Sequence, residues 1–161
     1  MPPITALLHT ANAGLRLGRA LETLLPCAEI LIVDRHSSDS TLRVARQYGA
    51  RIVPQSIQPA ANGHLEHARY DWILCLDPSE SITESLQATL FEWSSWPVNR
   101  ILGKSSFSVS VRDQISEEWR TSSKPQTRLV PRNWTQWHGF LPADDCSSIP
   151  LEGELLRLAY P

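Results

Sequence analysis

Three polar side chains in the first half of the chain each follow an apolar run. These residues are Thr10, Asp34 and Asp77. A carboxylate at the end of a strand accepts charge-assisted hydrogen bonds from N–H donors, and carboxylates also bind hard divalent cations such as Mg²⁺. Their types and positions therefore make these residues candidates for ligand binding.

The elements that must position these residues alternate between strands and helices. Apolar periodicity predicts strands at 4–10, 29–33, 50–53 and 72–76 and helices at 17–24 and 41–48. This alternation is typical of a doubly wound parallel sheet, in which ligands bind outside the carboxyl ends of the strands. Thr10, Asp34 and Asp77 are therefore expected on one rim.

The pattern changes in the second half of the chain. Apolar positions predict a helix over 82–93, a half-exposed strand at 107–111 and further strands at 126–130 and 154–159. We interpret these strands as antiparallel additions to the parallel half-sheet. The expected fold class is α/β, as a three-layer sandwich.

Length and charge exclude several classes of protein. The chain has 161 residues, which suits one domain with one core. Its 15 basic and 17 acidic residues give no basic surface for nucleic acid or anionic membrane. No apolar run approaches the roughly 20 residues of a membrane span, and the first residues lack a signal-peptide pattern, so a cytoplasmic protein is expected. Three cysteines support neither a disulfide framework nor a zinc site.

Several segments, in this order and spacing, resemble the start of a family-two glycosyltransferase with the GT-A fold. The matching pieces are residues 4–12, 32–41, 48–50, 62 and 71–77, with thinner similarity at 127–132 and 137–139. The resemblance is greatest to bacterial enzymes that add sugars to lipopolysaccharide cores, which implies a role in making cell-envelope polysaccharide. It implies a single GT-A-like domain over 1–161, with a nucleotide-binding half at 1–80 and a truncated acceptor-side half at 81–161.

The resemblance also implies roles for individual residues. Thr10, Asn12, Asp34 and Asp77 correspond to the nucleotide-binding positions, and Asp34 is expected to accept the N–H of a uracil base. The alternative for Asp34 is an anchor for the turn at Ser37, and for Thr10 and Asn12 an ordinary strand-end turn. Asp39, by contrast, is expected to cap the following helix.

Asp77 corresponds to the first carboxylate of the family's D-x-D motif, which holds Mn²⁺ or Mg²⁺ against the diphosphate. The second aspartate is replaced by Ser79, a poorer ligand for a divalent ion. Glu80 follows and is the second candidate metal ligand. The motif is therefore degenerate, and this departure puts metal binding in doubt.

An inverting sugar transfer needs a base that takes the proton of the acceptor hydroxyl. Asp144 and Asp145 are the candidates, provided that their loop folds over the rim; solvated loop carboxylates are the alternative. Three functions remain open. One is transfer of a sugar from a nucleotide-diphosphate sugar, expected to be a UDP-sugar, to an acceptor hydroxyl. The second is a catalytically impaired relative that acts as a nucleotide-binding or scaffold module. The third is a doubly wound domain with an unrelated function, since fold does not determine function.

Weaker patterns lie elsewhere in the chain. His64 and His67 have metal-like spacing, but no third ligand follows, which favours surface histidines. Trp119, Trp134 and Trp137 have faces suited to stacking on a sugar, although packing is the more common role of such residues. The tryptophan content leaves a partner surface open, including one in a homo-oligomer.

Overall fold

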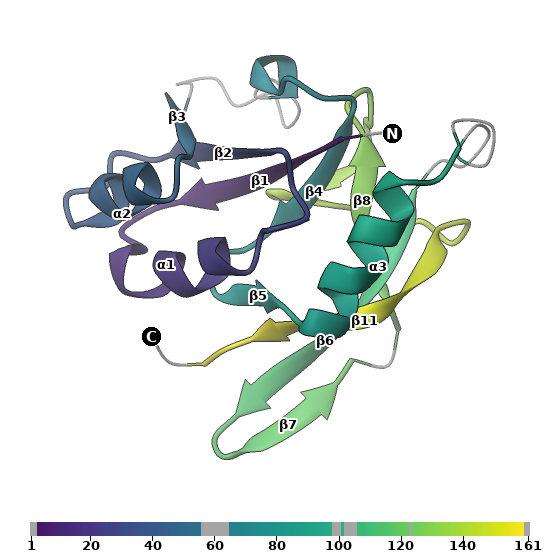
Figure 1. The fold of residues 1–161 in the computed structure, drawn as a ribbon. Coiled ribbons are helices and arrows are strands. Elements are labelled where there is room, and N and C mark those ends of the chain that lie inside the picture. The colour runs from purple at the N-terminus through teal and green to yellow at the C-terminus, as the bar shows by residue number, and fades with distance from the viewer. Residues whose placement is uncertain (1–2, 56–64, 98–100, 102–105, 123, 160–161) are drawn as a thin grey trace.

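A curled mixed β-sheet runs through the molecule, with helices packed against it (Figure 1). The structure is a computed structural model that describes residues 3–55, 65–97, 101, 106–122 and 124–159. The strands of the main sheet are β1 (Ile4–Thr10), β2 (Glu29–Asp34), β3 (Arg51–Pro54), β4 (Trp72–Leu76), β5 (Glu80–Ile82), β6 (Phe107–Ile115), β7 (Glu118–Thr121), β8 (Gln126–Pro131) and β11 (Ile149–Arg157). Two short strands, β9 (Trp137–His138) and β10 (Leu141–Pro142), pair with each other.

The strand order in the described part of the main sheet is β3-β2-β1-β4-β8-β6-β11-β5, and β7 pairs with β6. The first four strands in this order are parallel, as the sequence predicts. Strand β8 runs antiparallel to both β4 and β6. Strand β11, however, runs parallel to β6 and antiparallel to β5. The second half thus adds mostly antiparallel pairs and one parallel pair, and the predicted α/β fold class is confirmed.

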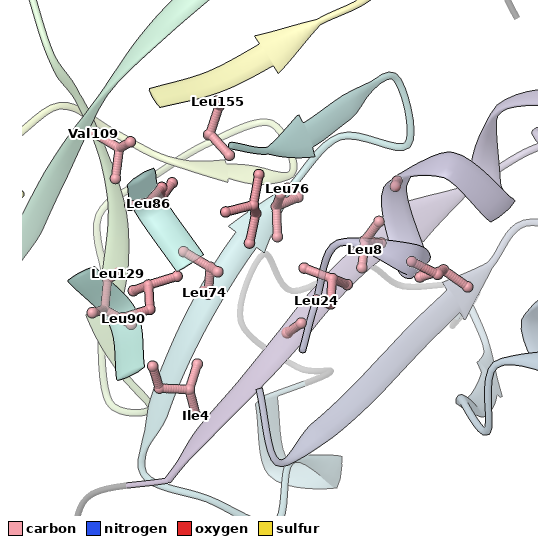
Figure 2. Close-up of a cluster of buried hydrophobic side chains, with 14 of the residues drawn as sticks. Ile4, Leu8, Leu24, Leu74, Leu76, Leu86, Leu90, Val109, Leu129 and Leu155 are labelled. Atoms are coloured by element: carbon pink, nitrogen blue, oxygen red, sulfur yellow. The ribbon is translucent and has the colours of Figure 1, made fainter. Parts of the chain in front are cut away.

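Three α-helices among the described residues cover one face of the sheet. They are α1 (Gly14–Glu22), α2 (Thr41–Gln47) and α3 (Glu84–Ser94). Side chains alternate between the two faces along a strand, so Ile4, Ala6 and Leu8 of β1 join the helices in one buried cluster. Figure 2 shows Leu74 and Leu76 of β4 in this cluster, near Leu86 of α3.

The opposite face is covered differently. Leu7 and Cys75 point into a second buried cluster, which is completed by the 3₁₀ turn η1 (Leu65–His67) and by Trp134 and Trp137. In the part of the chain that the structure describes, this layer is built from the 3₁₀ turn and the segment around β9 and β10.

Two features of the second half differ from the prediction. Ile82 belongs to the short strand β5, and α3 begins only after Thr83, whose hydroxyl oxygen accepts a hydrogen bond from the Leu86 N–H. The strand predicted as half-exposed is buried on both faces at its start, where Ser108 is 5% exposed between the buried Phe107 and Val109, and Ser106 just before the strand is buried as well. Serines can occupy such positions when their hydroxyls are hydrogen-bonded. None of the described helices is long and apolar enough to span a membrane.

Candidate functional site

The sheet brings the three sequence-predicted polar residues to one rim. Because β1 lies between β2 and β4 and all three are parallel, their carboxyl ends meet at the same edge. Thr10 and Asp34 are direct partners across the β1–β2 pair, and Asp77 directly follows β4. The rim geometry is therefore the one that the strand pattern predicts.

Asp34 is buried behind the rim and holds the turn that follows β2. Its Oδ1 accepts hydrogen bonds from the Thr10 hydroxyl at 2.7 Å and the Ser37 hydroxyl at 2.6 Å. Its Oδ2 accepts one from the Ser37 N–H at 2.9 Å. Burial acts to raise the pKa of Asp34, but these hydrogen bonds outweigh burial and lower the pKa below its ordinary value. The anchoring role left open by the sequence is therefore present, and base binding by the same carboxylate stays a prediction.

A second set of bonds ties the β1–α1 loop to the β2–α2 loop. Asn12 has a φ of 50°, and its Oδ1 accepts a hydrogen bond from the Ser38 N–H at 2.8 Å. The Asp39 carboxylate accepts hydrogen bonds from the N–H groups of Gly14 and Thr41, each at 2.9 Å. These are the first amides of α1 and α2, so Asp39 bonds to the start of both helices. It does not occupy the predicted cap position, because the N-cap residue of α2 is Ser40.

Asp77 sits at the exposed end of β4. Its Oδ1 accepts hydrogen bonds from the Ser79 N–H at 2.9 Å and the Ser79 hydroxyl at 2.6 Å. The Asp77 N–H in turn donates to Glu80 Oε1 at 2.8 Å. The side chain that replaces the second aspartate of the motif thus donates to the first one.

Glu80 lies in the core and forms a buried ion pair. Arg128 Nη1 and Nη2 approach Glu80 Oε1 and Oε2 at 2.6 and 2.8 Å, and both side chains are at most 1% exposed. Arg157 Nη2 adds a third contact at 3.1 Å to Glu80 Oε2. Two guanidinium groups therefore neutralise this carboxylate.

The predicted metal pair of Asp77 and Glu80 does not fit this arrangement. Both oxygens of Glu80 accept hydrogen bonds from arginine, and a cation placed there would meet the positive charge of Arg128 and Arg157. Of the predicted pair, Asp77 is the member whose carboxylate is available at the rim. Within the described ranges, no group of three or more His, Cys, Asp or Glu side chains is arranged to hold a metal ion.

A cavity of about 340 Å³ opens at the rim. Thr10, Asn12 and Asp77 line this cavity. Asp34 does not line it, but its carboxylate accepts a hydrogen bond from Thr10, which does. Arg16 of α1 and Arg35 also line the cavity. The sequence reasoning missed both arginines, although Arg35 follows Asp34 directly and so has the same strand-end position.

Aromatic side chains form one wall of this cavity. Phe140 stacks on His9 with ring centroids 4.4 Å apart. The Arg35 guanidinium carbon lies 5.6 Å from the centroid of the Phe140 ring, a distance typical of cation–π contact. Phe140 comes from the segment between β9 and β10, which no periodicity in the sequence connects with the rim.

The two candidate bases lie away from the rim cavity. Asp144 Oδ1 accepts a hydrogen bond from the Thr127 N–H at 3.1 Å. Asp145 accepts hydrogen bonds from Ser106 and Ser147, and it lines a different cavity together with Trp134. The structure does not bring either carboxylate together with Asp77, and catalysis by them stays a prediction.

The remaining predicted residues divide into two groups. Asn62 and His64 lie outside the described residues. Trp134 and Trp137 are partly buried against the second core cluster, so both pack as the more common role predicts.

Comparison with known proteins identifies relatives of the chain. No known family profile matches it. It is 30% identical over 95 residues to an uncharacterized glycosyltransferase of Rickettsia felis, which covers 54% of this chain and 32% of that protein. A second uncharacterized glycosyltransferase, of Rickettsia bellii, is 32% identical over 91 residues, covering 52% of this chain and 30% of that protein. Over about half of its length, the chain is similar in sequence to proteins named glycosyltransferases.

The chain spans about a third of the length of the curated proteins that it matches. Among solved structures, glucosyl-3-phosphoglycerate synthase of Mycobacterium tuberculosis aligns with a TM-score of 0.47 and 18% identity, covering 70% of this chain and 44% of that one. S. aureus TarS aligns with a TM-score of 0.47 and 14% identity, covering 72% and 37%.

Proposed function

We propose that the chain is the nucleotide-binding part of a glycosyltransferase, and that the rim cavity binds a nucleotide-diphosphate sugar. A UDP-sugar is the expected donor, and an acceptor hydroxyl is the expected recipient of the sugar. We expect this acceptor to belong to a bacterial envelope polysaccharide, in keeping with the resemblance of the rim segments to lipopolysaccharide core enzymes.

The observation that carries this proposal is the cavity at the carboxyl ends of β1, β2 and β4. Ligands of parallel sheets bind at this place. The volume of about 340 Å³ lies within the range of small-molecule sites. Similarity to proteins named glycosyltransferases supports a nucleotide-sugar as the ligand class.

Asp34 and Thr10 supply the base-binding corner in this proposal. A carboxylate offers roughly four acceptor positions, and Thr10 and Ser37 together donate three hydrogen bonds to Asp34. One acceptor position of Asp34 is left for the N–H of uracil, and because Asp34 is buried and does not line the cavity, the base must reach it past Thr10. The lowered pKa keeps Asp34 ionised at neutral pH, so that it acts as an acceptor.

A catalytically impaired module is the second candidate function. It is favoured by the placement of Asp144 and Asp145, which lie outside the cavity that holds Asp77. Without a base beside the donor, the cavity would bind a nucleotide without transferring its sugar.

Calorimetric titration of UDP, ADP and GDP, with and without Mn²⁺, tests the proposal. Ala11 is exposed and lines the cavity, so Ala11→Trp is expected to block the site and weaken UDP binding at least tenfold. Leu15 is 82% exposed and lies outside the lining, so Leu15→Trp is the matched control and should bind UDP like the parent chain.

Failure of every nucleotide to bind under either condition would contradict both candidate functions. UDP binding without hydrolysis of UDP-sugars or transfer to any acceptor would support the impaired module over the enzyme.

A further inference from the structure

The charges that line the rim cavity suit an anion. Its charged lining residues are Arg16, Arg35 and Asp77, so two permanent positive charges face one carboxylate. Guanidinium groups bind phosphate oxygens through strong charge-assisted hydrogen bonds, often with two parallel N–H donors. A diphosphate, with several negatively charged oxygens, matches this balance.

Both guanidinium groups keep donors available for such a ligand. The Arg35 guanidinium carbon lies over the Phe140 ring, 5.6 Å from its centroid, and this contact with the ring uses none of the five N–H donors as a hydrogen bond to a protein acceptor. Arg16 stands in the first turn of α1, and its Nη2 donates to the Ala159 carbonyl oxygen at 3.4 Å. This bond joins Arg16 to Ala159, in the segment after β11.

The carboxylates near the cavity are poorly available to bind a cation. Glu80 is neutralised by Arg128 and Arg157, and the Ser79 hydroxyl donates to Asp77 Oδ1. A cation-centred site would need these groups as acceptors for a metal ion. The chain instead places positive side chains where the diphosphate is expected.

We propose that Arg16 and Arg35 bind and neutralise the diphosphate of the nucleotide directly, so that binding does not require a divalent cation. This inference rests on the proposed function of the same cavity. It assigns both arginines as diphosphate-binding residues, and it makes Asp77 a negative charge that weakens anion binding.

Calorimetric titration of UDP in EDTA and in Mn²⁺ tests the inference. The dissociation constants are expected to agree within about threefold. Arg16→Gln and Arg35→Gln should each weaken UDP binding in EDTA by at least about tenfold, the effect of losing one charge-assisted hydrogen bond. Inorganic pyrophosphate should compete with UDP in the parent chain. Arg43 is exposed on α2 and outside the cavity lining, so Arg43→Gln should bind UDP like the parent chain.

The variant Asp77→Asn distinguishes a site in which arginines bind the diphosphate from one in which a metal ion binds it. If arginines hold the diphosphate, removal of the carboxylate charge should leave UDP binding in EDTA unchanged or tighter. Binding that appears only with Mn²⁺ and is lost in Asp77→Asn would overturn the inference while the proposed function stands. Circular dichroism establishes that each variant is folded, and Arg16→Lys provides a second test at Arg16 that preserves the charge.

Discussion

Arg128 and Glu80 are the residues whose burial most constrains the rest of the site. The Arg128 guanidinium donates to both Glu80 oxygens, to the Cys75 carbonyl oxygen and to Gln126 Oε1. Arg128→Met removes these donors and leaves a buried carboxylate with only Arg157 as a cationic partner. We expect the free energy of unfolding to fall by about 3–5 kcal/mol, measured by urea denaturation.

Arg112 provides the control for this prediction. It pairs with Glu154 at 3.2 Å, and the two side chains are 41% and 35% exposed. Because water screens such a pair, Arg112→Met should cost about 1 kcal/mol or less. Equal losses for the two variants would contradict a special role for the buried pair. The double variant Glu80→Leu/Arg128→Met should be more stable than Arg128→Met alone, since no unpaired buried charge remains.

The positions of the rim residues could be predicted from the sequence, but the side chains that pair with them could not. The positions of Thr10, Asp34 and Asp77 follow from strand ends and parallel order alone. The partner of Glu80 does not, because Arg128 is 48 residues away and its pairing depends on the placement of β8 beside β4. The sequence therefore predicts Glu80 as a metal ligand, whereas the fold pairs its carboxylate with Arg128.

At the scale of elements, Gly153 allows β11 to cross the start of α3. The residue has a φ of +102° within the register shift between Pro150 and Glu154, as in a β-bulge. A Cβ at this position would lie 2.4 Å from the Leu86 amide nitrogen. Gly153→Ala combines backbone strain with a clash against a helix backbone, and we expect it to lower the free energy of unfolding by at least about 3 kcal/mol.

Gly49 isolates the strain component of this effect. Its φ is +73°, and nothing lies within 4 Å of a Cβ built there. Gly49→Ala should therefore cost only about 1–2 kcal/mol, the penalty of the left-handed conformation. Thermal unfolding of both variants measures the difference. A Gly153→Ala protein as stable as Gly49→Ala would show that α3 and β11 separate readily.

The strength of each element's own pattern decided which elements could be predicted. Strands β1, β2 and β4 and helix α1 carry apolar runs or stripes of their own, and the sequence predicts all of them. Strand β5 has three residues and exists because β11 pairs with it, so its local sequence continued the helical pattern of α3. The parallel pairing of β11 with β6 likewise depends on contacts between distant segments.

At the scale of the whole molecule, the cavity is built from segments that lie far apart in the chain. His9 and Arg35 come from the predicted half-sheet, whereas Phe140 arrives from the β9–β10 segment. Hydrophobic periodicity fixes the sheet and the helices but carries no information about which loop folds over the rim. The arginine-lined character of the cavity therefore becomes visible only in three dimensions.

The stability of the whole molecule should depend on pH through Asp34. Its pKa is lowered in the folded chain, so its contribution is fully present above the unfolded pKa of about 3.9 and is lost as the pH falls through the folded pKa. Ser37→Ala removes the 2.6 Å hydrogen bond to Asp34 and should lower the free energy of unfolding by about 1.5–3 kcal/mol at pH 7. Urea denaturation at pH values between about 2 and 7 measures this, and the difference in free energy of unfolding from the parent chain should shrink below about pH 4.

Ser95→Ala is the control. The Ser95 hydroxyl donates to the Glu92 carbonyl oxygen, which does not titrate, so the free energy lost in Ser95→Ala should not vary with pH. A Ser37→Ala deficit that is equally constant would mean that the Asp34 charge does not stabilise the turn.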